Sequence, residues 1–349
     1  MTAAGGTVLR VRGLRVRYAS ARRSAADDVL RGVDLSVHAG EIVGVIGETG
    51  SGKTTLARAI VGLVDPVAGS VEFEGRDISG LHGRERRALR RAGGIQLVFQ
   101  DPLRSLDPDL TVESVVAEGL AVRGRIRAEE RGDRVRAALE LVGLDPLLAH
   151  RRPGEISGGQ RQRVALARAV ILEPRLLICD EPVSALDASN RNYILRILGE
   201  LRDRLEPGLI VISHDLGSLA GVADRVAVLY RGRIVEEGPI GEVFAAPRHP
   251  YTALLIASAP HLSRSRLPFD LEPGQIRRSP AESTPQASAC AFAPRCRFAS
   301  SECVLEQPAA RELAPGHRVE CHHAETWKAR ARPLSSTTPF TYQRGAPNR

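Results

Sequence analysis

One glycine-rich segment carries the residue types that bind nucleotide phosphates. It runs Gly47-Glu48-Thr49-Gly50-Ser51-Gly52-Lys53-Thr54-Thr55 and fits the pattern G-x-x-x-x-G-K-S/T. Its glycines let consecutive backbone N–H groups point inward at phosphates, and the helix that follows presents its positive N-terminal end to them. We expect Lys53 to reach the β- and γ-phosphates and Thr54 to hold Mg²⁺ through its hydroxyl. The alternative, a glycine-rich turn with an accidental lysine, is disfavoured by the flanking strand and helix patterns.

Two acids follow an apolar run that predicts a buried strand. The run is Leu176-Leu177-Ile178-Cys179, and the acids are Asp180 and Glu181. A strand that ends beside the glycine-rich loop would let Asp180 hold the Mg²⁺ shell and let Glu181 polarise the attacking water. Taken alone, two acids at the end of a strand also fit a solvated turn.

A second anion site is predicted just before a helix over residues 161–170. The segment is Ile156-Ser157-Gly158-Gly159-Gln160. The alternative is an ordinary capped helix start, because serine is a favoured N-cap residue. A chain with one phosphate loop needs no second phosphate site of its own. We therefore expect this segment to contact ATP held by another subunit, in a head-to-tail dimer with nucleotide between the two copies.

The elements that must position these residues alternate between strand and helix patterns. A helix is expected at 54–63, directly after the loop, and strands at 8–16, 33–37, 41–46, 70–73, 95–99, 176–179, 209–213, 225–230 and 234–236. Residues 102–170 predict a helical insert, with helices at 112–122 and 129–142. From about residue 247 Pro, Ser and Arg rise, so that 267–289 predicts a linker or loop-rich region and 333–349 a disordered tail. The fold class is therefore α/β with a small additional C-terminal region.

Composition and charge narrow the class of protein. The chain has 349 residues, 43% hydrophobic and 26% charged, which is globular usage. Its net charge of +8 comes almost entirely from arginines spread along the chain, so we expect no nucleic-acid partner. The densest arginine cluster, at residues 84–91, has helical spacing and predicts a solvated helix face. The sequence has neither a membrane-spanning apolar run nor the pattern of a secretion signal, which predicts a cytosolic protein.

Taken in order, these motifs resemble the ATP-binding cassette (ABC) family over about residues 7–245. The residues that carry the resemblance are the loop at 47–54, Gln100, Ser157-Gly158-Gly159-Gln160, Asp180-Glu181, Ser184-Ala185-Leu186-Asp187 and His214. The resemblance implies a P-loop NTPase cassette with a mixed sheet core and a helical subdomain. It also implies that ATP is bound with Mg²⁺ and hydrolysed.

The resemblance assigns roles to four further residues. Tyr18 matches the aromatic residue that stacks on adenine, and Gln100 matches the glutamine that senses Mg²⁺ and the γ-phosphate. Asp187 matches the loop that communicates across the dimer, and His214 matches the histidine that contacts the γ-phosphate. Together with Glu181, Gln100 and His214 form the predicted catalytic set. Because these residues and Lys53 are all present, we expect turnover rather than a degenerate regulatory cassette.

Segments after the cassette are similar to the C-terminal extension of oligopeptide and dipeptide importer ATPases. They are His249-Pro250-Tyr251-Thr252, Ala293-Pro294-Arg295-Cys296 and Cys321-His322, which set the predicted extension at 246–332. The stretch 99–108 is also similar to this family and favours the second of the two ATPases that such importers usually pair.

Four of the five cysteines gather in this extension, at positions 290, 296, 303 and 321. The gaps of five, six and seventeen residues do not match the close pairs of regular zinc sites. Four thiolates around a larger object suit an iron–sulfur cluster, to which the resemblance also points. We therefore predict a 4Fe–4S cluster on Cys290, Cys296, Cys303 and Cys321, with zinc and metal-free thiols as alternatives. Cys179 is expected to be a small buried hydrophobe.

The resemblance implies an ATPase subunit that energises an importer of di- and oligopeptides from the cytoplasmic face of the cell membrane. The implied partners are two membrane permease subunits, a sister ATPase and an extracytoplasmic solute-binding protein. Importers of nickel and glutathione share the extension, so the cargo stays open, as does the choice between homodimer and heterodimer. The rival is a soluble cassette ATPase acting on nucleic acid or ribosomes. Such proteins carry a long coiled coil, an inserted zinc module or a second cassette, which the sequence does not suggest here.

Overall fold

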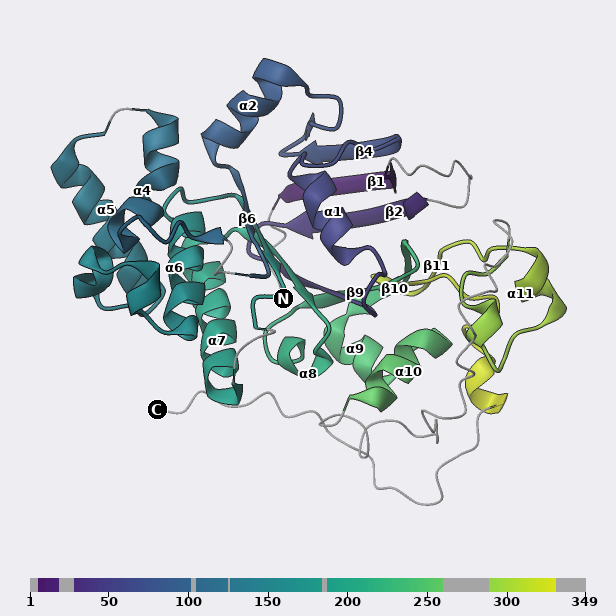
Figure 1. Cartoon of the computed structure of the whole chain (residues 1–349). Coiled ribbons are helices and arrows are strands. Elements are labelled where there is room, and N and C mark those ends of the chain that lie inside the picture. Colours follow the sequence, from purple (N-terminus) through teal and green to yellow (C-terminus); the bar gives the residue numbers. More distant parts are fainter. Residues whose placement is uncertain are drawn as a thin grey trace.

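The computed structural model describes residues 6–18, 28–101, 105–124, 126–183, 187–259 and 289–330. The predicted tail at 333–349, nearly all of the predicted linker at 267–289, and Ser184-Ala185-Leu186 lie outside these residues. The described chain is arranged around two sheets, with a group of helices on one side of the larger sheet and the C-terminal extension on the other (Figure 1).

An eight-stranded mixed sheet forms the centre, in the order β11-β12-β10-β9-β3-β8-β7-β6. Five strands run parallel: β6 (Ile95–Val98), β7 (Leu176–Asp180), β8 (Gly208–Ser213), β3 (Ile42–Ile46) and β9 (Arg225–Tyr230). The other three pair antiparallel at one edge: β10 (Arg233–Pro239), β12 (His317–Val319) and β11 (Arg311–Ala314). Every residue of β3, β7 and β8 is buried, as expected for parallel strands covered on both faces.

A four-stranded antiparallel sheet packs against the first, in the order β2-β1-β4-β5. Its strands are β1 (Thr7–Arg17), β2 (Asp28–His38), β4 (Ala68–Phe73) and β5 (Arg76–Asp77). Helix α1 (Lys53–Ile60) contributes Leu56 and Ile60 to the core shared by the two sheets. Helix α2 (Gly83–Ala92) buries no residue, and the predicted solvated arginine face is confirmed except at Arg86, whose half-buried side chain bonds to Leu81 and Asp65.

The helical insert forms a separate layer at the β6 side of the sheet (Figure 1). Its main helices are α4 (Val112–Arg123), α5 (Ala128–Leu141) and α6 (Gly158–Val170), with the short 3₁₀ turns Pro146–His150 and Pro153–Glu155 between α5 and α6. Thr111 caps α4 by accepting a hydrogen bond from the Ser114 amide. Helices α7 (Ala188–Leu205) and α8 (Leu216–Leu219) follow the strands β7 and β8 and cover the central sheet.

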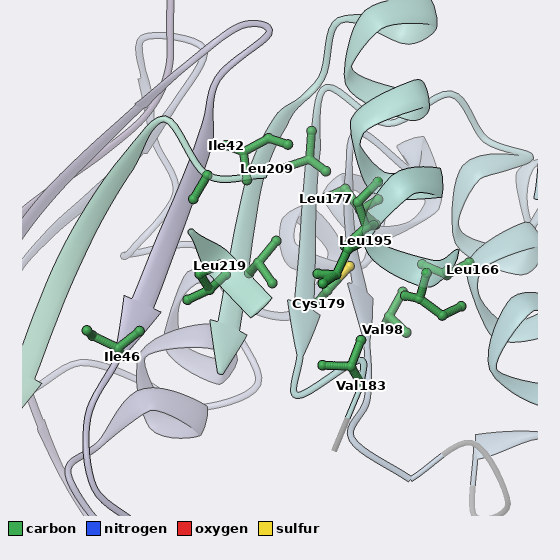
Figure 2. Close-up of a cluster of buried hydrophobic side chains, with 14 of the residues drawn as sticks. Ile42, Ile46, Val98, Leu166, Leu177, Cys179, Val183, Leu195, Leu209 and Leu219 are labelled. Carbon is green, nitrogen blue, oxygen red and sulfur yellow. The ribbon is translucent and has the colours of Figure 1, made fainter. Parts of the chain in front are cut away.

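The core between the sheet and these helices surrounds Cys179. Figure 2 shows its sulfur near Leu177 of β7, Leu195 of α7 and Leu166 of α6. Cys179 is fully buried, and burial raises the pKa of its thiol to about 12. The prediction that Cys179 is a buried hydrophobe is therefore confirmed.

The C-terminal extension does not form a detached module, because it completes the central sheet and core. Its elements are α10 (Pro250–Ser258), the 3₁₀ turns η5 (Ala293–Arg295) and η6 (Trp327–Arg330), α11 (Ser301–Leu305), β11 and β12, and α9 (Ile240–Ala245) lies directly before it. The sequence predicted no strands here. Strands β11 and β12 have only four and three residues and no clear apolar alternation, so the sequence predicts neither the pairing of β12 with β10 nor that of β11 with β12.

A buried carboxylate and an aromatic cluster join the extension to the sheet. Glu236 of β10 is fully buried; its carboxylate accepts hydrogen bonds from the amides of Arg248 and His249 and lies 2.8 Å from the His317 ring. Tyr230 at the end of β9 has ring-centroid distances of 4.4 Å to Tyr251 and 5.3 Å to Phe292. Such aromatic pairs add about 0.5–1.5 kcal/mol each beyond the area they bury.

Within the described residues, no helix is both long enough and apolar enough to cross a membrane.

Candidate nucleotide-binding site

The phosphate loop lies between β3 and α1, and two of its glycines cannot be replaced without a clash. Gly47 has φ +156°, and a Cβ there would lie 2.1 Å from the carbonyl oxygen of Leu229. Gly52 has φ +110°, and its Cβ would lie 2.9 Å from a methyl carbon of Leu30. The sharp turn between strand and helix is therefore open only to glycine at these positions.

Lys53 points back over the loop that it follows. Its side chain is buried, and Nζ donates hydrogen bonds to the carbonyl oxygens of Gly47 and Glu48, at 2.8 and 2.9 Å. Burial lowers the pKa of Lys53, while the carboxylates of Glu181 and Asp180 act in the opposite direction. An ammonium group held at the phosphate loop by two backbone carbonyls is suited to bind phosphate oxygens.

Asp180 and Thr54 meet at the end of β7 beside the loop. Burial raises the pKa of Asp180, and a hydrogen bond with the Thr54 side chain opposes that rise. In the described residues, Asp180 Oδ1 and Ser51 Oγ are buried without a hydrogen-bond partner. Buried oxygen atoms that make no hydrogen bond and lie next to a phosphate loop fit Mg²⁺, which prefers oxygen ligands.

Glu181 lies directly after Asp180 and is contacted by two other predicted residues. Gln100 donates a hydrogen bond to Glu181 Oε2 at 2.7 Å, and His214 Nδ1 lies 3.4 Å from Glu181 Oε1. The backbone of Glu181 has φ +50°, an uncommon conformation for a residue with a side chain. Such strain is found at functional sites, where surrounding structure enforces it. Here the Glu181 amide is fixed by a hydrogen bond to Ile212 in β8. The structure thus brings Gln100, Glu181 and His214 together.

Tyr18 lies at the end of β1 close to α1. Its hydroxyl is 3.4 Å from Thr55 Oγ1, and 41% of the residue is exposed. An exposed ring beside the first turn of α1 is placed where it can stack on a flat base.

The Ser157 segment begins α6 as a capping box. Ser157 Oγ accepts from the Gln160 amide, and the Gln160 side chain accepts from the Ser157 amide, at 3.2 and 2.8 Å. Ser157 and Gly158 are exposed, whereas Gly159 is buried against Asn190 of α7. The alternative of an ordinary capped helix start therefore describes the local geometry, and it is compatible with an exposed anion-binding helix end.

Asp187 lies next to this segment as the N-cap of α7. Its carboxylate accepts hydrogen bonds from Ser189 Oγ and from the amide and side chain of Asn190, which lower its pKa to about 2. The α6 start lies in the helical layer, whereas the phosphate loop lies at α1 beside the smaller sheet (Figure 1). The structure therefore forms two groups: the loop with Asp180, Glu181, Gln100 and His214, and the Ser157 segment with Asp187.

Comparison with known proteins bears directly on this arrangement. Residues 30–184 match the family model "ABC transporter", and residues 235–303 match "Oligopeptide/dipeptide transporter, C-terminal region". A Brucella ovis protein named for peptide import and ATP binding is 42% identical over 316 residues, covering 90% of this chain and 97% of the relative. The chain belongs to the ABC transporter family.

Other relatives and solved structures agree with the family. The oligopeptide transport ATP-binding protein OppF of Salmonella typhimurium is 42% identical to this ABC ATPase. The match covers 83% of this chain and 86% of OppF. The dimeric ATP-binding cassette MJ0796, solved with ADP and Pi, has a TM-score of 0.61 at 29% identity and covers 66% of this chain. CbiO1 from Clostridium perfringens has the same TM-score at 28% identity and covers 74% of it. These matches cover 98% and 97% of the two solved chains. The predicted cassette fold, with its mixed sheet and helices, is confirmed, and this ABC protein is an ATPase.

The four cysteines of the extension all lie within the described residues. Burial raises the pKa of Cys321 to about 12, and the neighbouring thiols of Cys296, Cys290 and Cys303 add to that rise. The Cys290 amide donates a hydrogen bond to the Cys303 carbonyl, which brings these two residues together. However, no three or more His, Cys, Asp or Glu side chains of the described residues are arranged to hold a metal ion. As they lie, the cysteines do not fit a single-ion site.

Two residues at the loop were not predicted as site residues. Tyr251 and Arg295, both from the extension, contact Glu48 in the phosphate loop. The sequence did single out the motifs that contain them, but only for their resemblance to importer ATPases. Because about 200 and 250 residues separate them from the loop, no local spacing signal could reveal the contacts.

Proposed function

We propose that this chain is the ATP-hydrolysing motor subunit of an importer for di- and oligopeptides. The observation that carries this function is the grouping of Gln100, Glu181 and His214 beside the Lys53 loop. The names of the relatives, which refer to peptide import and oligopeptide transport, support the cargo class.

In this function, the residues of the phosphate loop and the residues around it have separate roles in binding and hydrolysing ATP. Tyr18 stacks on adenine, the loop amides and Lys53 bind the phosphates, and Thr54, Asp180 and Gln100 are the candidate holders of Mg²⁺, which neutralises phosphate charge. Glu181 accepts a proton from the attacking water. His214 contacts the γ-phosphate.

The second group completes the site of a facing subunit. Ser157, Gly158, Gly159 and Gln160 contact ATP held by the partner, and Asp187 lies at the contact between the copies. Support comes from the exposed α6 start and from the dimeric state of the similar cassette MJ0796. The facing subunit is a sister ATPase or a second copy of this chain.

The remaining partners follow from coupling ATP hydrolysis to transport. Two permease subunits form the pore and hold this chain at the cytoplasmic face of the membrane, and an extracytoplasmic solute-binding protein delivers cargo. We divide the chain into a cassette at 7–245 and an extension at 246–332.

For the extension we propose an iron–sulfur cluster on Cys290, Cys296, Cys303 and Cys321, with zinc or free thiols as the alternatives. The proposal rests on the cysteine spacing and on the backbone hydrogen bond that joins two of these buried or half-buried cysteines, Cys290 and Cys303. The described side chains are not arranged to hold a metal ion, so a cluster would require the cysteines to rearrange around it. Iron, sulfide and zinc analysis of anaerobically purified protein decides among them. Stoichiometric zinc without sulfide, or no metal at all, would end the cluster hypothesis.

Purification of the intact membrane complex, followed by reconstitution into vesicles, tests the transport function. We expect two permeases to co-purify and MgATP to drive uptake of labelled di- and oligopeptides. Uptake of nickel or glutathione, without uptake of peptides, would assign one of these solutes as the cargo instead. Co-purification with ribosomes or nucleic acid in place of permeases would overturn the transport function.

A further inference from the structure

The phosphate loop is held by three hydrogen bonds from the C-terminal extension, all centred on Glu48. The Glu48 amide donates to the Tyr251 hydroxyl at 2.9 Å. The Arg295 guanidinium donates to both carboxylate oxygens of Glu48, at 2.7 and 2.9 Å. A two-point arginine–carboxylate pair fixes orientation as well as distance, unlike the single contacts of most surface ion pairs.

Arg295 is itself held in place by its surroundings. It ends the 3₁₀ turn η5, in which the Cys296 amide bonds to Ala293, and its side chain is only 21% exposed. The guanidinium carbon lies 5.7 Å from the Tyr230 ring centroid and 5.8 Å from that of Phe292. Flanking by two aromatic rings restricts a guanidinium to few conformations.

Tyr251 is equally constrained. It is fully buried in the first turn of α10, where its amide donates to the His249 ring. Its ring packs against Tyr230 and Phe292. The hydroxyl therefore reaches the loop from a rigid base.

These contacts act on the part of the loop that must bind phosphate. Backbone amides of a phosphate loop bind best when their directions are fixed in advance. The Glu48 carboxylate also adds a negative charge next to the site of a polyanion, and that repulsion is offset by the paired arginine. Within the cassette, the Ser51 carbonyl accepts from the Gly232 amide of the β9–β10 turn. The loop is thus fixed from both the cassette and the extension.

We propose that Arg295 and Tyr251 are positioning residues for ATP binding, so that the extension forms part of the nucleotide site. This role rests on the ATP site proposed above. Because the contacts organise the loop equally for ATP and for the transition state, their loss should raise KM while leaving kcat nearly unchanged.

The test compares Arg295→Ala and Tyr251→Phe with the wild-type full chain. We expect the Kd for MgATP, measured by calorimetry, to rise about tenfold for Arg295→Ala and about threefold to tenfold for Tyr251→Phe. In the reconstituted complex, KM should rise by similar factors, with kcat within about twofold. The Kd and KM of Arg295→Lys should lie between those of the wild type and those of Arg295→Ala, because an ammonium keeps the charge but cannot make the two-point contact. The Glu48 amide should exchange its hydrogen faster in both variants.

Two controls separate positioning from general damage. Arg131→Ala removes an arginine from a partly exposed ion pair with Glu113 in the helical layer and should match the wild type. In a Glu48→Gln background, Arg295→Ala should lose most of its effect, because the two residues act as one unit.

The outcomes distinguish this role from the ATP site itself. If the wild-type chain does not bind MgATP, the proposed function fails. If the wild type binds but Arg295→Ala and Tyr251→Phe bind equally well, the positioning role alone is wrong. An Arg131→Ala effect as large as that of Arg295→Ala, or an Arg295→Ala effect unchanged by Glu48→Gln, would also overturn it.

Discussion

At the scale of single residues, the site combines a buried carboxylate with a strained backbone. Asp180 is 4% exposed and Glu181 has a left-handed backbone, yet the two are consecutive. The strand β7 buries the first acid, and the turn that follows directs the second toward Gln100 and His214. Two adjacent carboxylates therefore lie in different surroundings, which suits one to a metal ion and the other to a proton.

Asp180→Asn should make the protein without nucleotide more stable at neutral pH. Burial raises the folded-state pKa of Asp180, so the charged carboxylate destabilises the fold, and this penalty fades as pH falls through that pKa. A neutral amide lacks the penalty, so we expect a larger unfolding free energy than that of the wild type at pH 7, and the difference should shrink in acid. Stabilisation by MgATP should be lost. Thermal unfolding between pH 4 and pH 8 measures both effects; a less stable variant at pH 7 would contradict the account.

At the scale of elements, two adjacent helix starts form the proposed second half of the site. The α6 start is capped by Ser157 and the α7 start by Asp187, and Asn190 packs against Gly159 between them. Both caps leave their first turns near the surface, so a facing subunit can approach them. The Ser157 cap could be predicted from sequence, since Ser-x-x-Gln is a recognisable cap pattern. Helix α7 and its Asp187 cap were not among the predicted elements, and the packing of the two helix starts against each other has no signal in local sequence.

Ser157→Arg should abolish turnover while isolated subunits still bind MgATP, because the residue acts on the nucleotide of the facing copy. A lost cap alone costs about 1 kcal/mol of stability. Thr111→Arg is the matched control, since it removes a cap from α4 outside the predicted site. Calorimetry and phosphate release separate the two effects. Loss of MgATP binding by the Ser157 variant, or equal loss of turnover in the Thr111 variant, would contradict an action between subunits.

At the scale of the whole molecule, cassette and extension share one core. Tyr251, Phe292 and Trp327 are fully buried or nearly so, and all belong to the same cluster as the central strands. The Trp327 indole donates to the Arg248 carbonyl, and Glu236 of β10 binds the start of α10. Such shared burial predicts that the two regions unfold together.

The fluorescence of Trp327 makes that cooperation measurable, because it is the only tryptophan in the chain. In urea, its emission change should coincide with the loss of far-UV circular dichroism, which reports mainly on the cassette. An emission change that is complete at clearly lower urea would show an extension that unfolds on its own.

Features that depend on residues close together in the sequence could be predicted, whereas features that depend on contacts between distant residues could not. Strands such as β3, β7 and β8 were predicted because every residue is buried and the apolar runs are continuous. The phosphate loop was recognised because its chemistry requires fixed spacing within eight residues. The short strands β11 and β12 were missed, as were the contacts of Tyr251 and Arg295 with Glu48, because they depend on pairing across distant parts of the chain. The cysteine spacing suggested a metal group that the described arrangement does not fit as a single-ion site.

Glu181→Gln tests the central claim most directly, since it removes the proton acceptor and keeps the shape of the side chain. MgATP turnover and ATP-dependent association of the purified chain, with its sister subunit if one co-purifies, are measured together. Turnover should fall at least about hundredfold, as expected for loss of a general base, while MgATP still binds and the ATP-loaded dimer persists. Turnover close to that of the wild type, or binding without any dimer, would contradict the account.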